Sequence, residues 1–248
     1  AEGIAKLNAE VRKKTPAVYD LENYPATIKG RNLKSMLTNF EALEEDLYLR
    51  GNKVSDNYKN ILRSLVNTKA VTQEVAVQYA VVVKRANLRN LPTGEALYYF
   101  AADNNFDALQ ETALDPCEPV IVLHTSENKQ FHYVQAANYR GWISVYDIAY
   151  TDRDTWLQFL KPKHFVVVVG KSIKLKTWND NVEYQLGSRI PISSEDNRSY
   201  VLNVPGRNKN GNLEKVKVKV AKNTSLAEGY LPYTSNNIVR SAFKFYGE

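Results

Sequence analysis

Residues 119–149 read PVIVLHTSENKQFHYVQAANYRGWISVYDIA, and they contain the strongest β-strand pattern in the chain. It holds three short runs rich in β-branched and aromatic residues: PVIVLHTS (119–126), QFHYVQAA (130–137) and RGWISVYDIA (140–149). Three residues separate the first run from the second, and two separate the second from the third. Runs of this length and composition, joined by tight connections, predict three neighbouring β-strands.

The residues on either side extend this β unit. QYAVVVKRANLR (78–89) predicts an earlier strand, and LYYFA (97–101) predicts part of another. Five short strands within about seventy residues, with one long connection near the start, are typical of a small SH3-like barrel. TDRDTWLQFL (151–160) predicts a short helix after the barrel, with Thr151 or Asp152 as its N-cap.

A second β unit is predicted downstream. HFVVVV (164–169) is a continuous apolar run, as in a buried strand, and SIKLKTW (172–178) alternates apolar and polar residues. YVLNVPGRNKNGNLEKVKVKV (200–220) predicts a long hairpin, because it contains the turn-forming pair Asn210-Gly211. In KVKVKV the valines are expected to face inward and the lysines outward, where they either protect an edge strand or form a basic ridge. We expect a second SH3-like barrel here.

The two ends of the chain are predicted to be helical. SDNYKNILRSLVN (55–67) begins with a capping serine, and GRNLKSMLTNF (30–40) is a shorter helix of the same kind. TPAVYDLENYPATIKG (15–30) contains two prolines and predicts an extended clip along another surface. At the other end, an apolar helical stripe starts after Ser235, its expected N-cap, and stops at Gly247.

The predicted fold class is therefore mainly β with an α-helical N-terminal region, two consecutive SH3-like β-barrels and a C-terminal helical stub. The stub resembles the beginning of a further domain. The predicted parts are a helical clip region, a first barrel, a second barrel, and a linker with the first helix of another domain, at residues 1–77, 78–160, 161–229 and 230–248.

The composition is that of a globular protein with a mild positive charge. Hydrophobic residues make up 44% and charged residues 24% of the chain, and the formal net charge is +6. This charge suits an anionic partner such as nucleic acid, a membrane surface or an acidic wall polymer, but we favour the simpler interpretation of a solvated surface. Because the chain has no arginine-rich arm or long basic run, we expect no nucleic-acid binding. No run approaches the roughly 18 apolar residues of a membrane span. The chain begins at Ala1 without Met, which favours a mature, exported protein whose signal peptide has been removed.

The sequence contains no recognisable catalytic motif. VVVVGKS (166–172) ends like a phosphate-binding loop, but Phe165 stands where that loop needs a glycine. Cys117 lies between Asp115 and Glu118, whose charges raise the pKa of a thiol, so we expect an unreactive, half-buried loop residue. Three histidines and one cysteine predict no zinc site and no internal disulfide, and we expect no cofactor. The residues alone predict a binding or scaffolding chain.

Several longer segments carry a resemblance to a known family. VVKRANLRNLPT (82–93), NNFDALQETALDPCEPVIVLHTS (104–126) and FHYVQAANYRGWISVYDIA (131–149) together resemble the first bacterial SH3-like domain of multidomain NlpC-type cell-wall peptidases. VYDLENYPATIKGRNLKSML (18–37) resembles the clip of that family. The second SH3-like domain is similar to the region from HFVVVVGKSIKL to EGYLPYT (164–234), and the first helix of the papain-like peptidase domain is similar to NNIVRSAFKFYGE (236–248).

The resemblance implies part of an enzyme that cleaves between D-glutamate and the diamino acid of peptidoglycan stem peptides. It also implies that the catalytic cysteine and histidines lie in a peptidase domain beyond Glu248, so we expect no catalytic residue in this chain. The first SH3-like domain would wall the cleft and admit peptides with a free N-terminal L-alanine. The alternative is a stand-alone, non-catalytic protein that binds or scaffolds the cell wall and ends at Glu248.

Four residues are candidates for substrate binding: Trp142, Tyr139, Tyr99 and Arg89. Trp142 either lines a groove or caps the core of the barrel. The two tyrosines either flank that groove or pack within the barrel as ordinary strand residues. In the linker, Tyr230 is expected to pack against the peptidase domain.

Arg89 and its neighbour Arg85 have two possible uses. Either arginine could meet a carboxylate of the substrate, or it could form an internal ion pair with Asp107 or Asp115. We favour the internal ion pairs, because both acids lie in the same predicted barrel.

Overall fold

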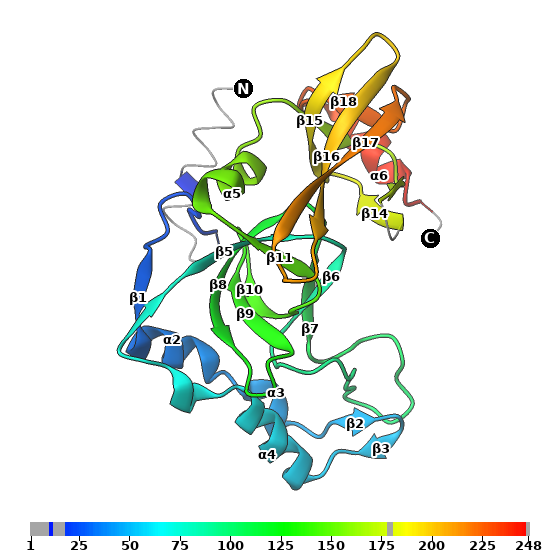
Figure 1. Cartoon of the computed structure of the whole chain (residues 1–248). Helices are drawn as coiled ribbons and strands as arrows, with labels where there is room; N and C mark the ends of the chain where they lie inside the picture. The colour runs from blue at the N-terminus through cyan, green and yellow to red at the C-terminus, as the bar shows by residue number, and fades with distance from the viewer. Residues whose placement is uncertain (1–9, 12–17, 178–180, 247–248) are drawn as a thin grey trace. The chain divides into compact units, whose positions relative to one another are not determined.

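The computed structural model describes residues 10–11, 18–177 and 181–246, and the chain is mainly β as predicted (Figure 1). It divides into two compact units. The first comprises Ala1–Tyr79, Asn87–Ala113 and Val120–Tyr146, and the second comprises Ala80–Ala86, Leu114–Pro119 and Asp147–Glu248. The helical N-terminal region therefore belongs to the same unit as most of the central strands. The four domain boundaries proposed from the sequence stay a prediction.

Seven strands form the largest sheet, in the order β11-β5-β8-β9-β10-β6-β7. This sheet and the five-stranded sheet described below are open, so the prediction of closed SH3-like barrels is wrong in that respect. The bounds of the seven strands are β5 (Gln78–Val82), β6 (Ala86–Arg89), β7 (Gln110–Leu114), β8 (Pro119–Thr125), β9 (Phe131–Gln135), β10 (Arg140–Ser144) and β11 (Ile148–Thr151).

The strands predicted from residues 119–149 are confirmed as β8, β9 and β10, although the last run continues into β11. β8 pairs antiparallel with β9, and β9 pairs antiparallel with β10, where Trp142 lies opposite Tyr133. Every residue of β9 is buried, and so are the first five residues of β8. Their apolar side chains therefore place these strands at the centre of the sheet.

Two predicted strands are each divided in the structure. The run 78–89 forms β5 and β6, and the run 140–149 forms β10 and β11. The two breaks meet, because the backbone N–H of Val83 donates to the carbonyl oxygen of Asp147 at 2.8 Å. The ammonium of Lys84 also lies 3.0 Å from the Asp147 carboxylate. Each strand therefore ends where the chain makes a contact with a residue distant in the sequence.

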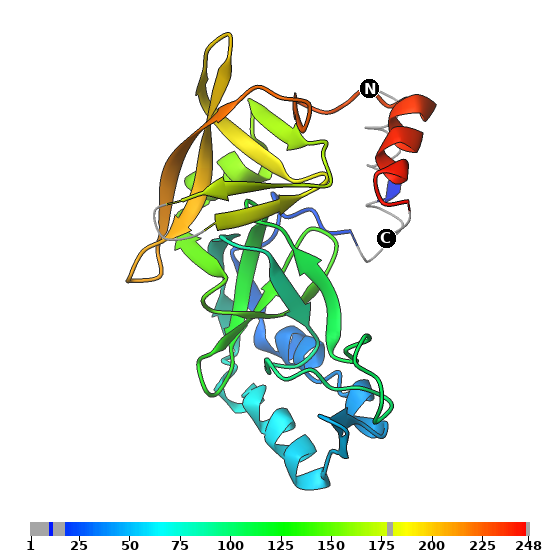
Figure 2. The ribbon, with the colours of Figure 1, turned by 90° about the vertical axis from the view of Figure 1, so that its right-hand side faces the viewer.

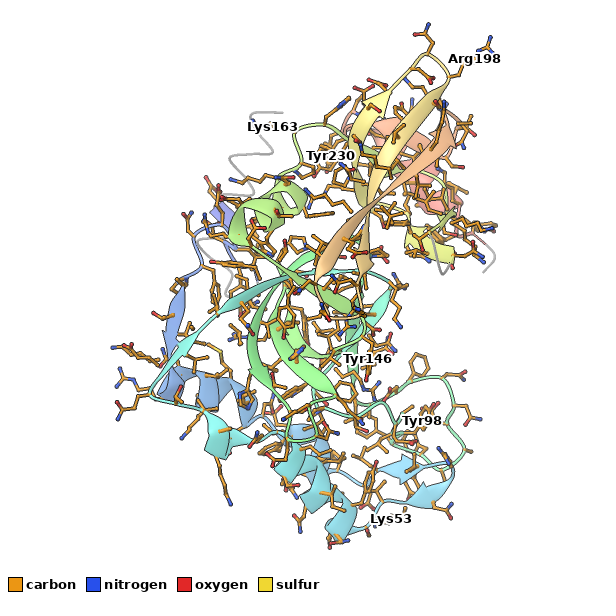
Figure 3. All side chains as sticks on the ribbon, viewed as in Figure 1. Lys53, Tyr98, Tyr146, Lys163, Arg198 and Tyr230 are labelled. Atoms are coloured by element: carbon orange, nitrogen blue, oxygen red, sulfur yellow. The ribbon has the colours of Figure 1, made fainter. Side chains whose placement is uncertain are left out.

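The segment LYYFA (97–101) is not a strand, which corrects the prediction. Within it, Tyr98 (labelled in Figure 3) forms an isolated bridge with Tyr48. Its aromatic residues do not share a buried face, since 71% of Phe100 is exposed. The strand that does form in this connection is β7, which the alternation of residues did not indicate.

Both helices predicted in the N-terminal region are confirmed, as α2 (Gly30–Leu37) and α4 (Asp56–Leu65). The Ser55 hydroxyl caps α4 by accepting from the Tyr58 backbone N–H at 3.3 Å. The clip is not irregular throughout, because β1 (Thr27–Lys29) pairs with β4 (Glu74–Ala76). Its earlier part reaches the central strands, where Tyr19 N–H donates to the Ala137 carbonyl at 2.8 Å. The other short elements are α3 (Glu41–Glu44), β2 (Tyr48–Leu49) and β3 (Asn52–Lys53).

The second unit contains a five-stranded sheet in the order β17-β16-β15-β12-β18 and the hairpin β13-β14 (Figure 2). The predicted β16–β17 hairpin is confirmed, and Gly211 in its turn has a φ of 86°, which favours glycine. β17 is an edge strand with Val216 buried and its lysines exposed, as expected. The bounds are β12 (Phe165–Val168), β13 (Ser172–Lys176), β14 (Asn181–Gln185), β15 (Arg189–Glu195), β16 (Ser199–Arg207), β17 (Leu213–Ala221) and β18 (Leu226–Glu228).

Two predicted helices complete the second unit, α5 (Arg153–Leu160) and α6 (Ser235–Phe243), which Figure 2 shows in red after an extended linker. Asp152 caps α5 by accepting from the Thr155 backbone N–H at 2.8 Å. The cap of α6 is Thr234 rather than Ser235. The predicted helix stop at Gly247 lies outside the described residues. Across the residues described above, no helix is long and apolar enough to cross a membrane.

Candidate functional site

A groove of about 490 Å³ lies in the first unit, and we call it the Trp142 groove. Its lining comes from α2 and the residues after it, from the clip, from β7, and from the β9–β10 connection with the start of β10. Two of the four predicted substrate-binding residues, Trp142 and Tyr139, are in this lining. The other two, Arg89 and Tyr99, are not among its lining residues.

Trp142 forms the floor of the groove and is only 1% exposed. Its ring packs against Tyr133, with the ring centroids 5.3 Å apart, and against His124 at 6.1 Å. Gly141 lets β10 lie this close to β6, because a Cβ atom at this position would stand 2.6 Å from the Arg89 carbonyl oxygen. Trp142 therefore fills the core and offers the groove little more than a ring edge.

One rim of the groove is acidic. Glu111 on β7 accepts a short hydrogen bond from the Tyr139 hydroxyl. This bond, together with partial burial, raises the pKa of Tyr139 to about 12. Both side chains are exposed, so a ligand can reach the Glu111 carboxylate. A carboxylate accepts several hydrogen bonds at once, so the bond from Tyr139 leaves capacity for a cationic group.

The groove also holds a guanidinium and a free acceptor. Arg140 donates to the Tyr19 hydroxyl and lies 5.1 Å from the centroid of that ring, which fixes the guanidinium at the clip side. The Oδ1 atom of Asn90 is buried and has no hydrogen-bond partner among the residues that the structure describes. A buried acceptor without a donor costs free energy, so this atom weakens the packing beneath the groove.

Arg89 is an internal residue with 5% of its side chain exposed. Its guanidinium lies 2.6 Å from the Asp107 carboxylate and donates to the Glu95 carbonyl at 2.7 Å. Arg85 pairs with Asp115 at 2.5 Å. The internal ion pairs that we favoured are thus confirmed for both arginines. Tyr99 lies on the 97–109 connection with 42% of its surface exposed.

The structure adds groove residues that sequence reasoning missed. Glu111, Asn90, Arg140 and Tyr19 come from four separate segments of the chain. Glu111 was overlooked because its segment was interpreted as a loop, and the strand β7 that presents it carries no clear alternation. For Tyr19, the one indication in the sequence is that residues 18–37 resemble the clip of the family.

Cys117 is buried, not half-buried as expected, and its φ of 74° is unusual for a residue with a side chain. Its Sγ atom lies 4.0 Å from the Tyr184 hydroxyl. Burial is the main reason that the pKa of the thiol is raised, and the Glu118 charge adds a smaller effect in the same direction. The pKa of Cys117 is raised, as predicted, but the main cause is burial rather than the neighbouring acidic residues.

We predict that Cys117 resists alkylation in the folded chain. Iodoacetamide reacts with thiolates, and this thiol is both buried and protonated at neutral pH. Mass spectrometry after a timed reaction should find almost no labelling in buffer and complete labelling in denaturing urea. Rapid labelling of the native chain would contradict the buried position of Cys117.

Comparisons with known proteins match this architecture. A family model described as an SH3 domain of the SH3b1 type matches residues 98–144. A search of curated proteins gave no significant match. A solved NlpC/P60 endopeptidase from Photobacterium damselae subsp. piscicida is similar, with a TM-score of 0.62 and 22% identity over 81% of this chain. An NlpC/P60 family protein from Bacillus cereus ATCC 10987 has a TM-score of 0.50 and 15% identity over 67% of this chain.

The predicted resemblance to NlpC-type endopeptidases with an SH3-like domain is confirmed at the level of fold. The chain spans 44% of the length of the Photobacterium protein and 63% of that of the Bacillus protein. The matched SH3 segment includes Glu111, Tyr139 and Trp142, so it supplies one part of the groove lining, while Asn90, α2 and the clip supply the rest.

Proposed function

We propose that this chain is the non-catalytic portion of an exported bacterial cell-wall cysteine endopeptidase that resembles γ-D-glutamyl-L-diamino-acid endopeptidases. In this role it shapes the access of peptidoglycan stem peptides and helps to target the wall. The observation that carries the proposal is the Trp142 groove in the SH3b1-type segment, with a carboxylate on its rim. The fold of the solved relatives supports the same cell-wall setting.

The groove is suited to a peptide with a free amine. An ammonium group needs a carboxylate or aromatic partner, and Glu111 with Tyr139 supplies both kinds of group. Asn90 also lines the groove, but its Oδ1 atom is buried and presents no surface to the ligand. Acylation of the amine removes its charge and adds bulk at the rim. Arg140 offers a counter-charge for a carboxylate of the same peptide.

The exposed apolar surface of the C-terminal helix α6 supports the proposal that a further domain completes the cleft. None of the residues of α6 in the described range is buried, although the helix is amphipathic. Large apolar side chains of the helix and its linker are exposed, including Tyr230, Tyr233, Ile238, Val239, Phe243 and Tyr246. An apolar surface of this kind marks an interaction site. We propose that it packs against the peptidase domain of the full protein.

The second candidate is a stand-alone, non-catalytic protein that binds or scaffolds the cell wall. The buried Cys117 with its raised pKa agrees with both candidates, because neither assigns catalysis to this residue. The gene sequence beyond the codon for Glu248 distinguishes the two proposals. An in-frame Asp-Cys-Ser segment supports the endopeptidase, and a stop codon supports the stand-alone protein.

The variant Glu111→Gln tests the amine-binding role. We expect it to reduce the preference for free-amine over N-acetylated stem peptide by roughly twofold to fivefold, as an exposed ion pair of about 0.5–1 kcal/mol requires. The measurement is the ratio of the two dissociation constants by titration calorimetry or NMR. Glu127→Gln, an exposed glutamate outside the groove lining, is the matched control and should keep the wild-type ratio. An unchanged ratio in Glu111→Gln would remove this residue from the proposal.

A further inference from the structure

Three side chains converge at one end of the five-stranded sheet in the second unit. His164 directly precedes β12, Glu195 ends β15, and Glu228 ends β18. The His164 Nε2 atom lies 2.9 Å from Glu228 Oε1 and 3.6 Å from Glu195 Oε1. All three donor atoms lie within 4.8 Å of one another. These contacts define what we call the His164 cluster.

The backbone holds the His164 cluster in place. β12 lies between β15 and β18 in the sheet, so each glutamate comes from a strand that is paired with the strand following His164. The His164 carbonyl accepts from Ile192 N–H at 2.9 Å, and the Phe165 carbonyl accepts from Gly229 N–H at 2.8 Å. These bonds hold His164 and the strand end at Glu228, while Glu195 is held by its pairing with Tyr200 on β16, so all three ligand-bearing positions belong to paired strands or directly adjoin one.

Lys222 orients one of the carboxylates. Its ammonium lies 2.5 Å from Glu195 Oε2, while Glu195 Oε1 is the atom nearer the imidazole. Lys222 is itself held over the Tyr200 ring at 4.6 Å. The two glutamates carry two negative charges and Lys222 carries one positive charge, so with a neutral imidazole the cluster has a net charge of −1. That charge favours an added cation.

We propose that the His164 cluster is a binding site for a divalent transition-metal ion of the Zn²⁺ class. Imidazole nitrogen and carboxylate oxygen are ordinary zinc ligands at about 2.0–2.2 Å, which places tetrahedral ligand atoms roughly 3.3–3.6 Å apart. The distance from His164 to Glu195, 3.6 Å, matches this spacing, and the distance to Glu228, 2.9 Å, is somewhat shorter. The imidazole disfavours Mg²⁺ and Ca²⁺, which take oxygen ligands. Three protein ligands leave a fourth position for water.

The site was not foreseen from the sequence, which predicted no zinc site on the basis of cysteine and histidine spacing. Its ligands are separated by 31 and 33 residues along the chain, too far apart for a local motif, and only the strand order brings them together. A bound ion would tie the ends of three strands. This role is independent of peptide binding in the first unit.

The test is a calorimetric titration of the whole chain, stripped of metal by a chelator, with ZnCl₂ and separately with MgCl₂. We expect one Zn²⁺ per chain, with no comparable binding of Mg²⁺. His164→Ala should weaken Zn²⁺ binding by more than the roughly 10–100-fold that loss of an outer-shell partner costs. Glu228→Gln, an exposed change that keeps the side-chain shape, should also weaken it, while Glu127→Gln should bind like the wild type.

Two results would overturn the proposal. One is the absence of Zn²⁺ binding to the wild-type chain, which would leave the His164 cluster as an imidazole–carboxylate ion-pair network. The other is Zn²⁺ binding that His164→Ala and Glu228→Gln both leave unchanged, which would place the ion elsewhere. As a second readout, Zn²⁺ should shift the ¹⁵N resonance of His164 Nε2, and the shift should be absent in Glu228→Gln at the same ion concentration.

Discussion

Replacing Trp142 by alanine is expected to destabilise the first unit by about 3–5 kcal/mol, the usual cost of removing a buried aromatic side chain. The side chain is 1% exposed and packs against the rings of Tyr133 and His124, so its removal leaves a cavity that β9 and β10 cannot close. Urea unfolding followed by circular dichroism measures the change.

The conservative variant Trp142→Phe serves as the control. It should lose less stability than Trp142→Ala, because part of the aromatic contact remains. If Trp142→Ala unfolded at the wild-type urea concentration, Trp142 would have to be a surface residue of the groove and not part of the core. The result therefore separates the two interpretations of Trp142 that the sequence left open.

Replacing Arg89 by alanine is expected to cost about 3–5 kcal/mol of stability, because it leaves the Asp107 carboxylate, only 13% exposed, without its charged partner. Asp107 also accepts the backbone N–H groups of Leu97 and Leu109, at 3.2 and 3.0 Å, so the whole connection before β7 depends on it. The measurement is again the free energy of unfolding in urea.

The chain contains a matched control for this variant. Arg50 and Glu95 also form an ion pair, at 3.3 Å, but their side chains are 80% and 43% exposed. Arg50→Ala should change the free energy of unfolding by no more than about 1 kcal/mol. If both alanine variants had equally small effects, burial would not determine the strength of the Arg89–Asp107 pair. A loss of peptide affinity without a loss of stability in Arg89→Ala would instead make Arg89 a ligand-binding residue.

The sequence was most informative where local patterns and packing agree. The runs at 119–126 and 130–137 formed strands because their apolar side chains are buried at the centre of a sheet. The hairpin around Asn210-Gly211 formed because the turn needs a positive φ that glycine supplies. The helix caps at Ser55 and Asp152 were also predictable, because each side chain bonds a backbone N–H three residues later. These features depend on residues close together in the chain.

The incorrect strand predictions have a common physical cause, which is contact between residues that are far apart in the sequence. The run 78–89 divides at Val83 because the chain there bonds Asp147, and no local pattern indicates that partner. The segment 97–101 has strong β-propensity, yet it lacks a neighbouring strand along its length. The prediction of closed barrels was wrong for the same reason. The order of strands in a sheet depends on contacts across the whole chain, and local sequence patterns do not indicate it.

The candidate site was predictable only in part. Trp142 and Tyr139 could be found because they are aromatic residues in the segment 131–149, which resembles the family, and both line the groove. Glu111 lies on a strand that the sequence pattern did not indicate, and Tyr19 comes from the clip, 92 residues before Glu111 in the chain. A binding groove built from four segments needs the fold before its polar residues can be assembled.

The most direct test of the proposed function is chemical-shift mapping of the ¹⁵N-labelled chain with a free-amine L-Ala-γ-D-Glu-diamino-acid peptide and its N-acetylated counterpart. We expect weak binding, with shifts at Glu111, Tyr139 and Asn90 for the free-amine peptide and almost none for the acetylated one. Equal shifts from both peptides, or shifts confined to residues 164–220, would contradict it.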